Sequence, residues 1–168
     1  MSASATEKSV LSTIQTTLQN HELIINAELK PGQQMLAELR DGVKKELIFY
    51  IDLFRVWKIW PDEFVAGRKY SRTISADPIK KEFICETVEN NIKYRKRFKD
   101  FESMTTWAFS LNGLKLMNTK EIEPAQYFVK VTVESKIRKL PSLLKAIILI
   151  PENEFSITMN SGSFSLPQ

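Results

Sequence analysis

The chain has 168 residues, of which 43% are apolar and 26% are charged, and its net charge is +4. These values are ordinary for a globular protein and exclude intrinsic disorder, collagen and coiled coil. The single cysteine, Cys85, excludes a disulfide framework and a cysteine-based zinc site, and the single histidine, His21, removes most serine–histidine and cysteine–histidine catalytic pairs.

The N-terminus is polar, so we expect residues 1–10 to form a tail and residues 11–168 to form one domain. Met1–Ser9 lack the apolar core of a signal peptide. The longest apolar run, Leu143–Ile150, is interrupted by Lys145 and is far shorter than the roughly 20 residues of a membrane helix. We expect no transmembrane segment in this chain, and an export leader removed ahead of Met1 is one interpretation of its polar start.

The first predicted element is a β-hairpin. Ile14, Thr16 and Leu18 alternate along one face, and Asn20 with His21 supplies a tight turn. The second strand of the hairpin carries its apolar side chains on one face, at Leu23, Ile25, Ala27 and Leu29.

A helix and a long strand follow the hairpin. After a break at Pro31 and Gly32, apolar residues recur at steps of three and four and predict an amphipathic helix over Gln33–Leu47. The residues that form this stripe are Leu36, Leu39, Val43 and Leu47. The next strand alternates over Phe49–Phe54, extends to Trp57 and Trp60, and ends at the turn Pro61–Asp62.

A second hairpin and a second helix are predicted further along the chain. Phe83–Val88 and Ile92–Phe98 alternate with period two, and two asparagines between them favour a turn. Asp100 is a suitable N-cap for a helix over Phe101–Leu111, and Asn112 with Gly113 is a typical stop signal.

Two further strands, Tyr127–Val133 and Phe155–Met159, complete the predicted elements. Because period-two alternation dominates, the expected fold class is α+β, with a mainly antiparallel sheet or sandwich and two short helices. In chain order the elements also suggest two strand-strand-helix-strand units, the second beginning near Lys81, that share one core.

The positive charge is concentrated in one short segment. Lys93, Arg95, Lys96, Arg97 and Lys99 together exceed the net charge of +4, so the rest of the chain is close to neutral. On a strand, all but Lys96 share one face, with neighbouring cations about 6.6 Å apart. One interpretation is an anion or nucleic-acid site. The other, which we favour, is a solvated face whose like charges resist edge-to-edge pairing, so nucleic acid is not an expected partner.

A second candidate site combines aromatic and charged residues: Arg55, Trp57, Trp60 and Asp62. The two tryptophans belong either to the core, which we favour, or to a groove for a partner, with Arg55 and Asp62 forming a charged pair nearby. A further alternative is a carrier of an apolar ligand, with Trp57 and Trp107 lining its cavity.

Catalytic signatures are sparse. The chain has no glycine-rich phosphate loop, no nucleophile elbow and no paired-histidine metal motif. We expect Cys85 to be a buried, inert thiol and His21 to be a solvated turn residue. Catalytic residues, metals and cofactors are therefore not expected, although folding could still assemble a site from carboxylates such as Asp52, Asp62, Glu63 and Asp77.

A collinear set of segments resembles the bacterial family catalogued as domain of unknown function 4390. The segments are LIFYIDLFRVWKIWPDEFVA, YSRTISADPIKKEFICET, FKDFESMTTWAFSLNGLKL, AQYFVKVTVESKIRKLPSLLK and EFSITMNSGSF. Within them, the resemblance rests on the long strand that ends in the candidate aromatic site, the step Asp77–Pro78, the helix from Phe101, and the step Leu140–Pro141.

The resemblance implies a place in the cell and assigns no reaction. Proteins of this family usually begin with an export signal, which implies the periplasm or cell envelope, with the cytoplasm as the alternative. Their genes are thought to lie near sensor-kinase genes, which implies a link to envelope signalling. The leading hypothesis is therefore a non-enzymatic envelope module that binds a protein partner or a surface through its sheet, in an oligomeric state that the sequence does not give.

Overall fold

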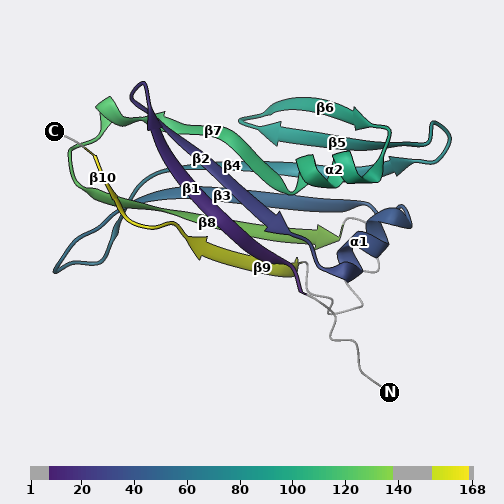
Figure 1. The fold of residues 1–168 in the computed structure, drawn as a ribbon, viewed down its shortest axis with the longest axis horizontal. Coiled ribbons are helices and arrows are strands. Elements are labelled where there is room, and N and C mark those ends of the chain that lie inside the picture. The colour runs from purple at the N-terminus through teal and green to yellow at the C-terminus, as the bar shows by residue number, and fades with distance from the viewer. Residues whose placement is uncertain (1–7, 138–152, 167–168) are drawn as a thin grey trace, which may run out of the picture.

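The computed structural model describes residues 8–137 and 153–166, which form two antiparallel sheets and two short helices (Figure 1). The smaller sheet has the strand order β1-β2-β7, and the larger sheet has the order β10-β8-β3-β4-β5-β6, with β9 also paired to β8. The helices are α1 (Gln33–Arg40) and α2 (Phe101–Ala108), and a 3-10 turn, η1 (Thr119–Glu121), follows β7. The strands are β1 (Val10–Gln19), β2 (Glu22–Lys30), β3 (Lys45–Arg55), β4 (Glu63–Asp77), β5 (Glu82–Glu89), β6 (Ile92–Phe98), β7 (Ser110–Asn118), β8 (Gln126–Ile137), β9 (Asn153–Asn160) and β10 (Phe164–Ser165).

The predicted α+β class, with mainly antiparallel pairing and two short helices, is confirmed at this level. Every strand pair among the described residues is antiparallel. None of the described helices is long and apolar enough to cross a membrane. The apolar run Leu143–Ile150 and the step Leu140–Pro141 lie outside the described residues.

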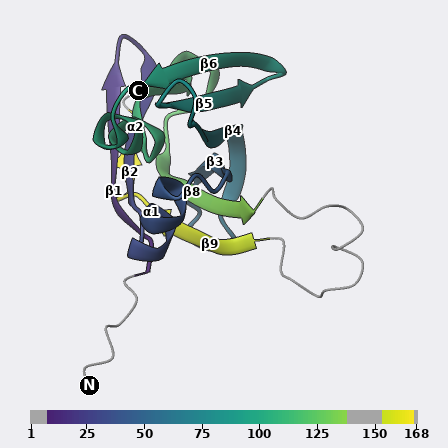
Figure 2. The same ribbon diagram turned by 90° about the vertical axis from the view of Figure 1, so that its right-hand side faces the viewer.

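The core lies between the facing surfaces of the two sheets, with β1 and β2 on one side and β3 and β4 on the other (Figure 2). The predicted inward face of β2 is buried throughout, as is one face of β3 and one face of β8. Alternation therefore identified the inward face of each of these strands. The buried side chains are Leu23, Ile25, Ala27 and Leu29 of β2, Leu47, Phe49, Ile51 and Leu53 of β3, and Tyr127, Val129, Val131 and Val133 of β8.

Both predicted hairpins form, and two-residue turns close them. Asn20 and His21 have φ angles of 50° and 62°, and Asn90 and Asn91 have φ angles of 48° and 65°. Two successive positive φ values define the turn type that matches the twist of antiparallel strands, and asparagine tolerates this conformation. The turns fix the register of β1 with β2 and of β5 with β6.

Both helices are shorter than predicted. The helix expected over Gln33–Leu47 ends at Arg40, because Gly42 turns the chain with a φ of 81° and β3 then begins. Leu47 belongs to β3, where pairing with β4 and β8 on both sides overrides the helical periodicity. The second helix ends at Ala108 instead of Leu111.

The predicted start of the second helix is confirmed. The carboxylate of Asp100 accepts a hydrogen bond from the backbone N–H of Ser103 at 2.7 Å, which is the geometry of an N-cap. This contact also lowers the pKa of the Asp100 carboxyl, because the hydrogen bond stabilises its charged form.

Three strands were not predicted: β4, β7 and the two-residue β10. The prediction that Asn112 and Gly113 stop a helix was wrong, because both lie within β7, where Gly113 has a φ of 67° and donates its N–H to the side chain of Asn26 at 2.7 Å. The register of β2 with β7 shifts at this point, as it does at a β-bulge. The chain order is β1-β2-α1-β3-β4 and then β5-β6-α2-β7-β8, so the strand that follows α2 is β7 and not the predicted Tyr127–Val133.

Candidate interaction surfaces

Three of the four cations predicted to share one face of a strand do so on β6, and the fourth, Lys99, directly follows the end of β6. We call the four the basic ladder: Lys93, Arg95, Arg97 and Lys99. Each is about half exposed or more, and each is paired with a carboxylate on the neighbouring strand β5. Lys93 lies 2.7 Å from the carboxylate of Glu86, which also accepts hydrogen bonds from Arg95. Arg97 and Lys99 lie 3.4 and 3.5 Å from the carboxylate of Glu82.

Four cations therefore form ion pairs with only two carboxylates, so the basic ladder has a net positive charge. The hydrogen bonds from Lys93 and Arg95 lower the pKa of Glu86, which holds this carboxyl ionised. Lys96, the predicted exception, points to the opposite face, where its ammonium lies 5.1 Å from the ring centroid of Trp107. The cations are about half exposed or more, so the pairs of Lys93 and Arg95 with Glu86 contribute little to stability, whereas the carboxylate shared by Arg97 and Lys99, that of Glu82, is only 6% exposed.

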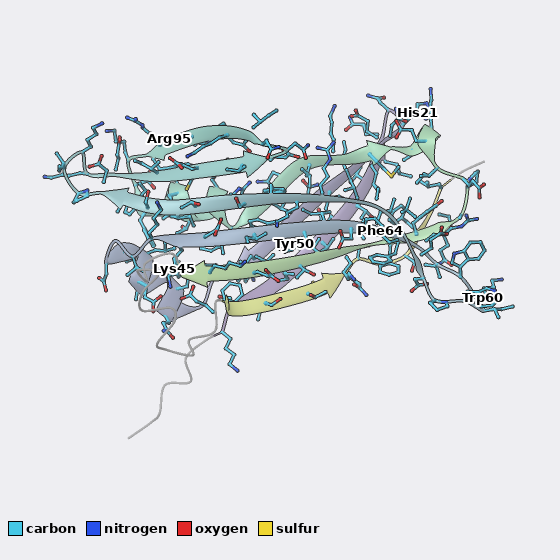
Figure 3. The ribbon with its side chains drawn as sticks, turned by 180° about the vertical axis from the view of Figure 1, so that it is seen from behind. His21, Lys45, Tyr50, Trp60, Phe64 and Arg95 are labelled. Atoms are coloured by element: carbon cyan, nitrogen blue, oxygen red, sulfur yellow. The ribbon has the colours of Figure 1, made fainter. Side chains whose placement is uncertain are left out.

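The second surface lies where β3 turns into β4, and we call it the aromatic end. The connecting loop exposes Ile59 and Trp60, whose exposed fractions are 89% and 74%. On the outer face of the larger sheet, the ring of Phe54 lies 5.9 Å from that of Phe64 and 5.4 Å from that of Phe128. Trp60 and Phe64 can be seen at this end in Figure 3. The aromatic end comprises Phe54, Trp57, Ile59, Trp60, Phe64 and Phe128.

Polar contacts hold the base of this loop in place. The backbone N–H and the indole N–H of Trp57 donate to the carboxylates of Asp62 at 3.3 Å and Glu63 at 3.2 Å. The guanidinium of Arg55 lies 4.3 Å from the ring of Trp57 and 3.0 Å from the carboxylate of Glu123. The nearby acidic side chains therefore have partners within the chain.

Three predictions about this segment were wrong. The strand ends at Arg55 and does not extend to the tryptophans. Trp57 and Trp60 are exposed, because they lie in a loop beyond the edge of the core. Arg55 pairs with Glu123 instead of Asp62, whose carboxylate caps the backbone of the loop.

The basic ladder and the aromatic end lie at opposite ends of the molecule, as Arg95 and Trp60 show in Figure 3. Through β5, Lys93 and Arg97 lie level with Ser71 and Ser75 of β4, which are 8 and 12 residues, or about 26 and 40 Å, from Glu63 at the aromatic end. The two surfaces are therefore far enough apart to contact different partners.

The cavity predicted for an apolar ligand does not form as expected. Trp107 packs in α2, with its ring 5.7 Å from that of Phe98, while Trp57 lies at the aromatic end. A different cavity, of about 600 Å³, opens between α1 and β9, and neither tryptophan lines it. Its lining includes Met35, Phe155 and Ile157 together with the carboxylates of Glu38 and Glu154.

The ammonium of Lys45 is the most buried charge in this region. It is 1% exposed and is ion-paired with both Glu38 and Glu154. The hydrogen bond from Lys45 lowers the pKa of Glu38. Glu154 also accepts a hydrogen bond from the hydroxyl of Ser135 at 2.7 Å, so these groups satisfy one another inside the fold.

The potential catalytic residues named from the sequence do not come together in one site. Burial raises the pKa of the Cys85 thiol to about 12, and His21 is exposed in its turn. Asp62 and Glu63 lie together at the aromatic end, where both accept hydrogen bonds from Trp57. Asp52 lies three residues before the end of β3, and Asp77 lies at the far end of β4. Among the residues that the structure describes, no group of histidine, cysteine and carboxylate side chains could hold a metal ion.

Sequence reasoning missed several residues of these surfaces. Ile59 and Phe64 belong to the aromatic end, and the outward positions of Phe54 and Phe128 could have been read from alternation along β3 and β8.

A buried arginine inside the fold was also not predicted. Arg72 donates to the backbone carbonyls of Trp107, Ala108 and Ser110. No pattern of apolar residues predicts such a role for an arginine.

Comparison with known families gives a match that covers most of the chain. Residues 6–161 match the model of the family described as Domain of unknown function (DUF4390). The chain belongs to this family. The predicted resemblance is therefore confirmed. No match was found among curated proteins or among solved structures.

Proposed function

We propose that this member of DUF4390 is a non-enzymatic module of the bacterial cell envelope, and that its aromatic end inserts into the interface of a lipid bilayer. The observation that carries the proposal is the exposure of Ile59 and Trp60 on a loop at one end of the molecule. Exposed apolar groups of this size are costly in water, and their grouping with Phe64 is typical of a contact surface.

The chemistry of the aromatic end favours a lipid bilayer as its binding partner. Tryptophan is enriched at membrane–water interfaces, because its ring is apolar while its N–H can still meet polar groups. Lys58 is exposed in the same loop, and the ammonium of Lys130 lies 4.4 Å from the ring of Phe54. Both cations are suitably placed to meet lipid phosphates, whereas Asp62 and Glu63 are hydrogen-bonded to Trp57.

The apolar area at the tip supports a measurable affinity. An aromatic side chain such as Trp60 offers about 150 Å² at its exposed fraction of 74%. Removing that area from water contributes at most about 3 to 4 kcal/mol. Ile59 adds to this value, so two neighbouring side chains supply enough free energy for reversible surface binding without a membrane-spanning segment.

Sedimentation with lipid vesicles tests the proposal. We expect the native chain to sediment with vesicles of phosphatidylethanolamine and phosphatidylglycerol, and the double variant Ile59→Ser/Trp60→Ser to bind at least tenfold more weakly. Ile79→Ser is the matched control, because Ile79 is 91% exposed but lies in the turn at the far end of β4. Circular dichroism checks that all three proteins are folded.

Several outcomes would contradict the proposal. Equal vesicle binding by the native chain and the double variant would remove the aromatic end as the contact surface. Absence of vesicle binding, together with photo-cross-linking of position 60 to an envelope protein, would assign the surface to a protein partner and refute the bilayer. Turnover of a generic esterase, phosphatase or protease substrate would refute the non-enzymatic part.

Envelope location and a link to signalling form the wider part of the proposal. Family membership supports the location, and a domain attached to the membrane at one end would present its other end to a protein partner. Fractionation of cells that carry the full-length gene tests this, because the proposal requires recovery with the envelope fraction and recovery with the cytosol would contradict it.

A further inference from the structure

Strand β6 ends the larger sheet at the side away from the aromatic end. It is the last strand in the order β10-β8-β3-β4-β5-β6, and within the described residues it pairs only with β5. Six of its seven residues are exposed, from Ile92 to Arg97. A strand at the edge of a sheet presents unpaired backbone groups that can accept another strand.

The hairpin geometry determines which backbone groups of β6 face outward. Glu89 and Ile92 flank the two-residue turn, and the residues that flank such a turn are hydrogen-bonded to each other. Hydrogen-bonded and non-hydrogen-bonded pairs alternate along an antiparallel ladder. The backbone groups of Ile92, Tyr94 and Lys96 therefore face β5, whereas those of the residues between them face away from it.

The residues whose backbone groups face away from β5 are also the residues with cationic side chains on the outer face of the sheet. Lys93, Arg95 and Arg97 thus combine a free backbone N–H and C=O at the edge with a positive side chain on the outer face. In an added antiparallel strand, the residue opposite each cation would exchange backbone hydrogen bonds with it and carry its own side chain beside that cation. Carboxylates at every second position of the added strand would meet the basic ladder in register.

Charge determines which strand can bind there. Four cations share the two carboxylates of Glu82 and Glu86, so the basic ladder has positive charge left to satisfy. A second copy of β6 would place like charges together, which disfavours self-pairing. A nucleic acid is less suited, because the one aromatic side chain in the exposed part of β6, Tyr94, points to the face opposite the ladder and offers no base stacking beside it.

We infer that β6 is a docking strand for an acidic, extended segment of another protein, which adds antiparallel to the larger sheet with carboxylates at alternate positions. This inference does not depend on the bilayer contact, because the two surfaces lie at opposite ends of the molecule (Figure 3). Taken together with the proposed bilayer contact, it would leave the two ends of the module with different partners.

A blocked, fluorescein-labelled peptide of alternating Glu and Thr is the probe, and fluorescence anisotropy gives its affinity for the full chain. We expect saturable binding that weakens at least tenfold between about 50 and 500 mM salt. The variant Arg95→Ser/Arg97→Ser should bind at least tenfold more weakly. Lys69→Ser is the matched control and should bind normally, because Lys69 is an exposed cation on the same sheet face, beside Tyr50 and away from the edge.

Backbone methylation separates strand addition from attraction between charges. In the antiparallel register, the N–H groups of the Glu residues face β6 and those of the Thr residues face solvent. Methylating the Glu nitrogens should therefore abolish binding, whereas methylating the Thr nitrogens should leave it within about twofold. Hydrogen exchange should show the amides of Lys93, Arg95 and Arg97 protected at least tenfold in the complex.

Three results would overturn the inference. Equal binding of the two methylated peptides would mean that charge alone attracts the probe. Tighter binding of a single-stranded oligothymidylate than of the peptide would assign the basic ladder to nucleic acid. No binding of the unmethylated peptide at low salt, by a chain shown to be folded, would remove β6 as an acceptor of acidic strands.

Discussion

Replacing Arg72 with methionine should destabilise the fold more than replacing any exposed cation. Arg72 lies on the inner face of β4, and its guanidinium donates to the carbonyls of Trp107 at 2.7 Å, Ala108 at 3.0 Å and Ser110 at 2.7 Å. The same group lies 4.2 Å from the ring centroid of Trp107. One side chain therefore ties the larger sheet to the end of α2 and the start of β7.

The expected cost follows from the exposure of the three carbonyl groups. Only the bond to Ala108 is fully buried, and leaving that carbonyl without a donor costs about 1 to 3 kcal/mol. The bonds to Trp107 and Ser110 are partly buried, and each contributes about 1 kcal/mol because water can replace the donor. Burial disfavours the charged guanidinium and lowers the pKa of Arg72, so methionine recovers part of the loss. We expect a net loss of about 3 kcal/mol.

Urea unfolding of three proteins measures this loss. Arg72→Met should lower the free energy of unfolding by about 3 kcal/mol, a large share of the stability of a typical domain. Arg68→Met is the control on the same face of β4, where the guanidinium is 39% exposed, donates to the carbonyl of Leu116 and pairs with Glu89, and a loss of about 1 to 2 kcal/mol is expected. A loss for Arg72→Met no larger than that for Arg68→Met would refute the reasoning.

Three further predictions concern buried groups. Because burial raises the pKa of Cys85 to about 12, its thiol should not react with Ellman's reagent at pH 8 until urea unfolds the chain, and stoichiometric reaction in buffer would contradict this. Lys45→Met should lower the free energy of unfolding at pH 7 by about 2 to 4 kcal/mol, since it leaves Glu38 and Glu154 unpaired. The stability lost in Lys45→Met should be smaller below about pH 4.5. Lys45 lowers the pKa of Glu38, so protonating Glu38 removes the stabilisation that its charged form gains from Lys45. A loss that does not change with pH would contradict this explanation. Burial raises the pKa of Asp52, which means that the charged carboxylate is destabilised in the folded chain. Asp52→Asn should therefore stabilise the fold at pH 7, where Asp52 is charged, and have no effect at pH 3, where it is protonated. Equal effects at both pH values would show that burial of the charge is not the reason.

Elements with regular alternation or a specific turn could be predicted from the sequence. The pairs Asn20–His21 and Asn90–Asn91 adopt positive φ angles that few other residues tolerate, so the turns of both hairpins were recognisable. In β3 and β8 the apolar residues alternate, because one face of each strand is buried against the smaller sheet. The N-cap at Asp100 was recognisable for a local reason, since its side chain replaces a missing backbone acceptor.

Other elements depend on contacts between distant parts of the chain. Strand β4 was missed because its inward face includes Arg68 and Arg72, which give no apolar alternation. The burial of Arg72 depends on acceptors at residues 107–110 that only the folded chain brings near. The tryptophans of the aromatic end were expected in the core for a related reason, because a tryptophan contributes the same signal to the composition whether it lies in a core or in an exposed loop. Trp60 is exposed because β3 ends at Arg55, and the pairing of β3 with β4 and β8 determines where it ends.

The most direct test of the bilayer contact is the environment of position 59 in the presence of lipid. In Ile59→Cys, an environment-sensitive NBD label can be attached selectively, because Cys85 is buried. On addition of phosphatidylethanolamine and phosphatidylglycerol vesicles, the label should brighten and shift to the blue, and lipids brominated near the headgroup should quench it. The same label in Ile79→Cys should not change. Identical responses at both positions, or no response at position 59, would contradict insertion of the aromatic end.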